Sequence, residues 1–179
     1  MGREIQFMAE YYITDLHSHI LFGIDDGADT IEESVEMLRM AEKQGVRNLF
    51  CTSHHWQSAP SDYEKNFALL KERVKREGIN INLYTGMEIL CEDDSYFPET
   101  LRDIKNGTVK TLNNTDYVLL EMSPFMSAEE IYECVDTVVE HTGKKVVLAH
   151  IERYRVLDGE DKIIAKLKEL GLQLNQGEE

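Results

Sequence analysis

The stretch TIEESVEMLRMAEKQGVRNLFCT, residues 30–52, predicts a helix followed directly by a strand. Apolar residues recur in it at helical spacing, at Ile31, Val35, Leu38 and Ala41. Thr30 and Glu33 form a capping box ahead of them, so the helix is expected to start near residue 31. The segment VRNLFCT then has the short apolar run of a buried strand. A helix followed by a buried strand is the unit from which α/β folds are built.

The same alternation continues on both sides of this unit. Further strands are predicted at the start of DLHSHILFGIDDG, residues 15–27, and at INLYTG, YVLLEM, KKVVLAH and LQLN. Further helices are predicted from Tyr63, Phe67, Leu70 and Val74, ending at Gly78, from PETLRDIKNG, from Ile131, Val135, Val138 and Val139, and from Ile163, Ile164, Leu167 and Leu170. The segment LNNTD predicts a turn. Strands alternating with helices predict an α/β fold with a mostly parallel sheet, either an open doubly wound sheet or a barrel.

Composition narrows the function classes. The chain has 179 residues, enough for one domain, and no apolar run of roughly 18 residues that would span a membrane. Residues 1–12 lack the apolar core of a secretory signal, so we expect a cytoplasmic protein with reduced, buried cysteines at Cys51, Cys91 and Cys134. The net charge of −15 argues against a nucleic-acid partner. No glycine-rich phosphate loop follows the first strand, which weakens a nucleotide-binding interpretation.

Histidines and glutamates gather where the predicted strands end. They are His17 and His19, His54 and His55 of TSHH, Glu88 of GMEI, into which the third strand is expected to run, Glu121 of LLEM, and His150 of LAH. Ligands and catalytic groups collect at the carboxyl ends of parallel strands. Alone, each residue is more simply a core or surface side chain; together they predict a site for Zn²⁺, Mn²⁺ or iron, with a carboxylate bridging two ions.

For each of three aspartates near the first strand, the sequence allows two roles. Strand geometry would send Asp15, His17 and His19 to one face, where Asp15 is either a ligand or the partner that orients a histidine. Asp25 and Asp26 are either ligands or turn residues ahead of the capping box.

The chain resembles the PHP (polymerase and histidinol phosphatase) superfamily from about Ile13 to Gln176. The motifs that carry this resemblance are DLHSHILFGIDDG, TSHH, GMEI, TLNNTDYVLLEMS and LAHIERY. Within this superfamily, the chain is similar to the manganese-dependent protein-tyrosine phosphatases of bacterial capsule and exopolysaccharide synthesis. The resemblance implies a distorted (β/α)7 TIM-like barrel with up to three metal ions. We therefore expect an N-terminal extension at residues 1–12 and a single PHP domain at 13–179.

The resemblance also implies roles for individual residues. His17, His19 and Glu88 would bind the first metal, Glu88 would bridge to a second that Glu121 also holds, and Asp26 and His54 would bind the third; His150 falls on a further ligand position and His55 does not. Arg153 would bind the substrate phosphate, since a guanidinium donates two parallel hydrogen bonds, and with His150 it is the candidate catalytic pair. The metal is expected to be manganese, with iron or zinc as alternatives.

The chain departs from the family pattern at its end. Family members continue to a final strand with Asp-x-His, a further pair of ligands, and a second phosphate-binding arginine, whereas this sequence stops at LQLNQGEE. We therefore expect a barrel incomplete at its last strand: a fragment, a natural short form, or a protomer that covers its open edge in a homo-oligomer.

The leading hypothesis is a phosphatase that uses metal-activated water to hydrolyse phosphotyrosine on the tyrosine autokinase of a polysaccharide-export system. No cysteine has an arginine six residues later, so the C-x5-R phosphatase loop is absent. One alternative is a phosphoesterase acting on a small phosphomonoester such as histidinol phosphate. Another is a catalytically impaired regulatory or binding module that keeps the fold.

Overall fold

A computed structural model of the chain describes residues 12–56, 59–91, 97–154 and 173–174. In these ranges strands and helices alternate, as the sequence predicts: β1 (Ile13–Ser18), α1 (Ile31–Lys43), β2 (Val46–Cys51), α2 (Pro60–Glu77), β3 (Asn82–Thr85), β4 (Glu88–Cys91), α3 (Phe97–Asn106), β5 (Tyr117–Met122), α4 (Ala128–Thr142), β6 (Lys145–Leu148) and β7 (Gln173–Leu174). The helix expected around residues 163–170 and the extension at 1–11 lie outside the described ranges. No described helix has the length and apolarity needed to cross a bilayer.

Local sequence signals account for the helix ends. The Thr30 side chain accepts a hydrogen bond from the Glu33 amide while Glu33 reaches back to the cap, so the predicted capping box is confirmed. Pro60 opens α2 in the first turn, and Gly78 ends it in the left-handed conformation that glycine adopts without strain. The LNNTD turn is also confirmed, with Asn113 and Asn114 at positive φ.

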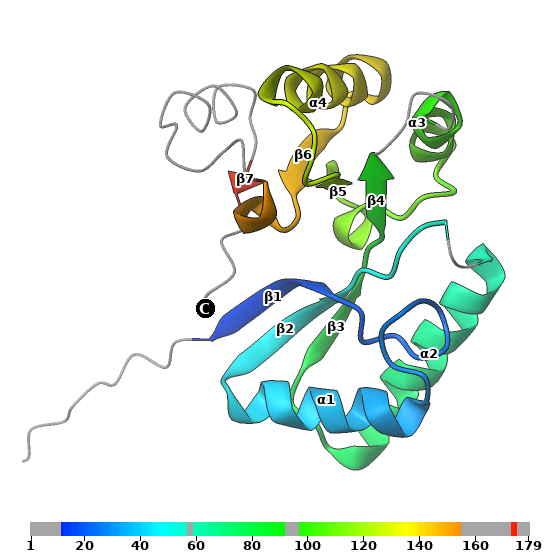
Figure 1. Cartoon of the computed structure of the whole chain (residues 1–179). Coiled ribbons are helices and arrows are strands. Elements are labelled where there is room, and N and C mark those ends of the chain that lie inside the picture. The colour runs from blue at the N-terminus through cyan, green and yellow to red at the C-terminus, as the bar shows by residue number, and fades with distance from the viewer. Residues whose placement is uncertain (1–11, 57–58, 92–96, 155–172, 175–179) are drawn as a thin grey trace, which may run out of the picture.

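The described strands form two sheets rather than the single sheet expected. All their pairings are parallel, in the orders β1-β2-β3 and β4-β5-β6-β7. Helices α1 and α2 lie beside the first sheet, and α3 and α4 beside the second (Figure 1). The coarse expectation, an α/β fold with parallel strands, is thus correct, while the division into two sheets was not foreseen.

The division falls at Gly86 and Met87, inside what the sequence presented as one strand. A Cβ on Gly86 would lie 2.9 Å from Thr52 Cγ2 and 3.0 Å from Leu112 Cδ2, so a larger residue at this crossing of the chain would require these side chains to shift. Beyond it Glu88 begins β4 and pairs in parallel with His54, past the end of β2. The Glu88 amide donates to Ser53 O at 3.2 Å, and this short bridge joins the two sheets.

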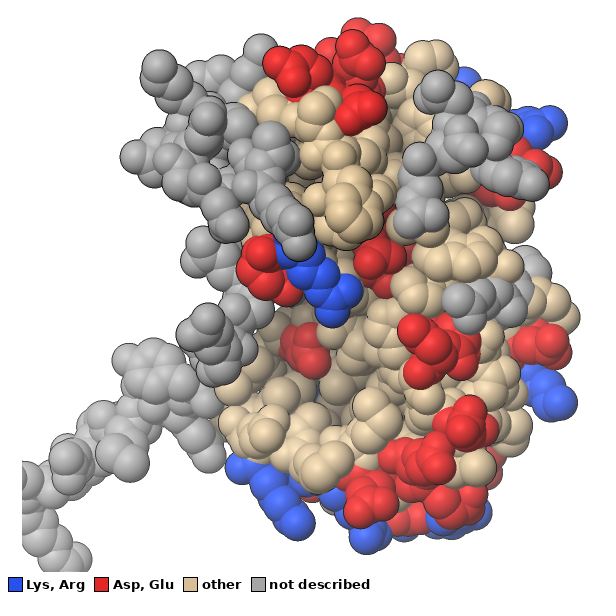
Figure 2. All heavy atoms as spheres, viewed as in Figure 1, with Lys and Arg blue, Asp and Glu red and all other residues tan. Residues whose placement is uncertain are grey.

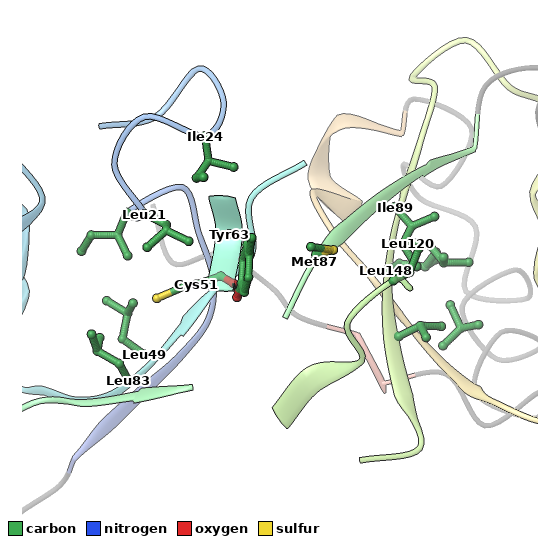
Figure 3. Packing of buried hydrophobic residues seen from close by; sticks show 14 of the residues in the cluster. Leu21, Ile24, Leu49, Cys51, Tyr63, Leu83, Met87, Ile89, Leu120 and Leu148 are labelled. Carbon is green, nitrogen blue, oxygen red and sulfur yellow. Dashed lines mark hydrogen bonds between the residues drawn. The ribbon is translucent and has the colours of Figure 1, made fainter. Parts of the chain in front are cut away.

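One hydrophobic core runs through both sheets. Leu49 and Leu83 of the first sheet belong to the same buried cluster as Ile89 and Leu120 of the second. Figure 3 shows these two groups of side chains with Met87 between them. Each such fully buried aliphatic side chain stabilises the fold by about 1.5–3 kcal/mol. All three cysteines are free and buried, which confirms their expected state.

Two buried tyrosines fix the ends of neighbouring strands. The Tyr63 hydroxyl donates to Cys51 O at 2.8 Å and accepts from the Gly86 amide at 3.1 Å, which ties β2 to the chain crossing. The Tyr154 hydroxyl donates to Ala149 O and accepts from the Met122 amide at 3.0 Å. Burial raises the pKa of both phenols, so they stay protonated and keep these bonds. The strand ends that carry the candidate ligands are therefore rigidly placed.

Candidate metal centre

Four histidines converge on the carboxylate of Glu88. His17 Nε2 and His150 Nε2 lie 3.1 and 3.4 Å from Glu88 Oε1. On the other oxygen, Oε2, His54 Nδ1 lies at 3.0 Å and His19 Nε2 at 3.2 Å. The Glu88 side chain is completely buried, and its four neighbours come from the ends of β1, β2 and β6. These four histidines and Glu88 are called the buried set below.

The position of Glu88 differs from the expectation that every ligand follows a strand. Glu88 is the first residue of β4, and Glu121 is the fifth of the six residues of β5. Glu88 nevertheless reaches the histidines because its backbone bridges to His54 beyond the end of β2. Because the chain crosses at Gly86, the carboxylate of Glu88, at the start of β4, lies beside the carboxyl ends of other strands.

The carboxylate of Glu88 is surrounded without being hydrogen-bonded. Although imidazole nitrogens lie within 3.4 Å, neither oxygen has a well-aligned hydrogen-bond partner among the described residues, and His54 Nδ1 likewise has none. Burial by itself would raise the pKa of Glu88, but the imidazoles outweigh it and hold that pKa below its ordinary value. A buried carboxylate surrounded by imidazole nitrogens is the arrangement that a divalent cation between them would satisfy.

The partners of His17 set its tautomer. Thr52 Oγ1 accepts from the Ser18 amide at 2.9 Å, contacts Ser18 O at 3.3 Å and lies 2.7 Å from His17 Nδ1. All three contacts are hydrogen bonds only if the Thr52 hydroxyl donates to Ser18 O and Nδ1–H of His17 donates to Thr52. Nε2 of His17 then carries the lone pair and faces Glu88, as a metal ligand requires. Thr52 was not among the predicted site residues; its position in the TSHH motif, two residues before His54, is the one sequence signal that points to it.

Asp25 performs the orienting role for His19. Its Oδ2 lies 2.8 Å from His19 Nδ1 and accepts from the His54 amide at 2.9 Å, and its Oδ1 accepts from the Gly27 amide at 3.2 Å. Burial raises the pKa of Asp25, but the bonds to His19 and the two amides outweigh it and lower that pKa. Burial likewise lowers the pKa of His19, whereas Asp25 and Glu88 raise it to about 10.

The glycines of the first motif allow its loop to close. The Ala28 amide donates to His19 O at 3.2 Å, and the Gly23 amide donates to Ala28 O at 2.8 Å. A Cβ on Gly27 would lie only 1.9 Å from His19 O, and Gly23 has a φ of +63°. The spacing of Gly23, Asp25 and Gly27 is therefore a consequence of wrapping the loop around His19.

The remaining predicted residues lie on the outside of the cluster. Asp26 Oδ1 is 3.5 Å from His19 Nδ1 and 3.6 Å from His54 Nε2, with its side chain 73% exposed. Glu121 and Arg153 approach each other to 4.0 Å, and the Arg153 side chain is 60% exposed. Burial, and then the charge of Glu88, raise the pKa of Glu121. We call Asp26, Glu121 and Arg153 the outer set.

Three groups of described side chains have ligand atoms close enough to hold an ion. They are His17, Glu88 and His150; His19, His54 and Glu88; and His19, Asp25 and Asp26. Glu121 belongs to none of these groups. Neither does Asp15, whose Oδ1 accepts from the His17 amide at 3.1 Å, so of its two interpretations the geometry favours the partner of a histidine over the ligand. His55 is held by its amide donating to Glu88 O at 3.0 Å and stays outside the three groups.

A cavity of about 470 Å³ opens onto this cluster. Its lining combines six members of the two sets with four apolar side chains: His19, Asp26, His54, Trp56, Leu90, Glu121, Met122, Pro124, His150 and Arg153. His150 adopts a left-handed conformation with φ of 51°, which is rare for a histidine and typical of functional sites. Around it, acidic side chains are spread over the face shown in Figure 2, in agreement with the net charge of −15.

The fold and the cluster define an α/β protein with three groups of side chains in metal-binding geometry. The chain belongs to the family named "Capsular polysaccharide synthesis, CpsB/CapC", whose model matches residues 13–177.

Named relatives and solved structures support this membership. The tyrosine-protein phosphatase CpsB of Streptococcus agalactiae serotype V is 32% identical over 161 residues, which cover 88% of this chain and 64% of the relative. YwqE of Bacillus subtilis strain 168, also named a tyrosine-protein phosphatase, is 30% identical, and the match covers 88% of this chain and 61% of YwqE. A chain from the crystal structures of YwqE from B. subtilis and CpsB from Streptococcus pneumoniae, described as metal-dependent tyrosine phosphatases, matches with a TM-score of 0.76 at 27% identity, over 90% of this chain and 65% of that one.

Proposed function

We propose that this protein is a metal-dependent protein-tyrosine phosphatase. The observation that carries the proposal is the convergence of four imidazoles on a buried carboxylate that has no aligned hydrogen-bond partner among the described residues, beside a cavity lined by an arginine. The relatives named as tyrosine phosphatases match 88% of this chain at 30–32% identity. The chain spans 64% of the length of the CpsB relative.

In this proposal His17, His19, His54, His150 and Glu88 hold the inner metal ions, and Asp26 and Glu121 complete their coordination. Bound divalent ions would supply a hydroxide near neutral pH and neutralise the phosphate oxygens. Arg153 binds the phosphate by its guanidinium fork, which is exposed beside the cavity and free to turn toward a ligand. Thr52 and Asp25 hold Nδ1–H of His17 and of His19, so that Nε2 of each ring presents its lone pair.

We also propose that the two sheets are parts of one distorted (β/α) barrel. The bridge between His54 and Glu88 makes the strand order continuous, from β1 and β2 through the bent β3–β4 segment to β5, β6 and β7. The contact of His17 Nε2 with His150 Nε2 at 2.9 Å brings the ends of β1 and β6 together, as a closed curvature requires. The proposed metal is manganese, and the proposed substrate is a phosphotyrosine protein such as a bacterial tyrosine autokinase.

The test is phosphate release from a phosphotyrosine peptide in Mn²⁺, with and without EDTA. His17→Ala with His19→Ala should abolish turnover and stoichiometric Mn²⁺ binding, while His141→Ala, an exposed histidine on α4, serves as the matched control. Histidinol phosphate run in parallel separates the two substrate classes. Turnover that survives EDTA, or that prefers histidinol phosphate, would contradict the proposal.

A further inference from the structure

Trp56 lies on the wall of the metal cavity and is the sole tryptophan of the chain. Its ring packs at a tilt on that of His54, with centroids 4.2 Å apart and an interplanar angle of 32°. The His55 ring meets it edge-on at 5.3 Å and 86°. Trp56 is still 44% exposed, so much of the indole remains open. An indole fixed against a histidine and open beside a cavity is placed to bind a ligand.

The lining of the cavity combines two kinds of side chain. Imidazoles, carboxylates and Arg153 are polar or charged, and Trp56, Leu90, Met122 and Pro124 supply apolar surface. Its volume of about 470 Å³ lies within the range of small-molecule sites. A ligand that suits both kinds of side chain carries an anionic group and, next to it, a flat apolar group. An aryl phosphate has this composition.

We propose that Trp56 selects aryl over alkyl phosphates by stacking its open face on the phenyl ring of the substrate. The inference rests on the proposed phosphatase function and names the residue that would make it specific for phosphotyrosine. A phosphate held by Arg153 and the metal-binding side chains leaves the ring bonded to it free to contact the apolar side chains. Offset stacking of two aromatic rings adds stability beyond the area buried, and an aliphatic phosphoserine side chain offers no ring to stack.

A purely structural role for Trp56 makes a different prediction. If the indole only supports His54, removing it would weaken metal binding and would affect every phosphate ligand equally. If the indole contacts the substrate, removing it would weaken aryl ligands selectively. The ratio of the affinities for two ligands with the same head group therefore separates the two roles.

The experiment measures binding of phenylphosphonate and methylphosphonate to the Mn²⁺-loaded protein by calorimetry. In the native protein phenylphosphonate should bind more tightly and change the tryptophan fluorescence, which arises from Trp56 alone. In Trp56→Ala the preference should fall by roughly threefold to tenfold, and Trp56→Phe should restore most of it. Leu69→Ala, at a position with a similar exposure of 43%, is the matched control and should keep the native preference.

Turnover gives a second readout. Trp56→Ala should raise KM for a phosphotyrosine peptide with kcat preserved, and should leave a phosphoserine peptide unchanged. Equal binding of both phosphonates by the native protein, no binding of either, or equal losses in Trp56→Ala would overturn the inference. Failure of the phosphatase proposal itself shows differently, as absent phosphotyrosine hydrolysis in a protein that still prefers phenylphosphonate.

Discussion

The buried set and the outer set contribute to one site but are held in different ways. Glu88 is fully buried and His17 is 10% exposed, and the rings around them follow strands fixed by Tyr63 and Tyr154. Asp26 and Arg153 are 73% and 60% exposed, and their side-chain contacts with the site are 3.5 Å or longer. Glu121, at 19%, is as shielded as His19 and His150 and differs from them in lying outside the three ligand groups. The first set is positioned by the backbone before any ligand arrives.

This difference indicates a division of labour. Residues fixed by packing cost little further entropy when they bind an ion, so the buried set suits tight, permanent binding. Exposed side chains with long contacts can move toward a substrate and away from a product. The following substitutions test this division, from the largest expected effect to the smallest.

Substituting Glu88→Gln should have the largest effect, because it removes the charge of the carboxylate that two of the three ligand groups share. We expect turnover to fall by at least about 10³-fold and metal-dependent stabilisation to disappear. In the native protein that stabilisation should reach about 2.7 kcal/mol at a metal concentration one hundred times Kd. Thermal unfolding with and without Mn²⁺ measures it, and an unchanged Tm shift in Glu88→Gln would show that Glu88 is not a ligand.

Asp25 and Asp26 are adjacent in sequence but are placed differently, so Asp25→Asn and Asp26→Asn form a matched pair. Asp25→Asn should weaken metal binding about 10- to 100-fold and destabilise the fold by about 1–3 kcal/mol, because His19 and two amides lose a buried acceptor. Asp26→Asn should change stability by less than about 0.5 kcal/mol, as exposed sites do. Urea unfolding measures the stability of the two variants, and Mn²⁺ titration measures their metal affinity. Equal losses in both variants would contradict the different roles of Asp25 and Asp26.

Arg153→Lys should have the smallest effect. The amine keeps the charge but loses the fork that binds two phosphate oxygens, so KM for a phosphotyrosine peptide should rise about tenfold. Bound metal and stability should match those of the native protein, because the Arg153 side chain is exposed and lies 4.0 Å from Glu121. Loss of metal in this variant would place Arg153 in the buried set instead.

The sequence anticipated the fold as far as local signals reach. The capping box at Thr30, the cap at Gly78 and the apolar runs of β2 and β5 depend on neighbouring residues, and all are confirmed. The break at Gly86 was missed because the residues that surround it, Thr52 and Leu112, are distant in sequence.

The site shows the same limit. His17, His19, His54 and His150 were identified because parallel strands bring their carboxyl ends to one edge. The roles of the aspartates could not be decided, since the pattern gives Asp25 and Asp26 the same surroundings. Asp25 reaches hydrogen-bonding distance of His19 Nδ1 only because the loop closes around Gly27.

By itself, the sequence determined the order of strands and helices and the residue types that gather at strand ends, because periodicity, caps and composition act over a few residues. Tertiary structure alone decided that Glu88, the first residue of its strand, becomes the buried centre of four histidines. It also decided that Thr52 and Asp25 set the tautomers and that Trp56 packs on His54. These outcomes depend on contacts between segments far apart in the chain, and such contacts exist only after the strands have paired and the core has packed.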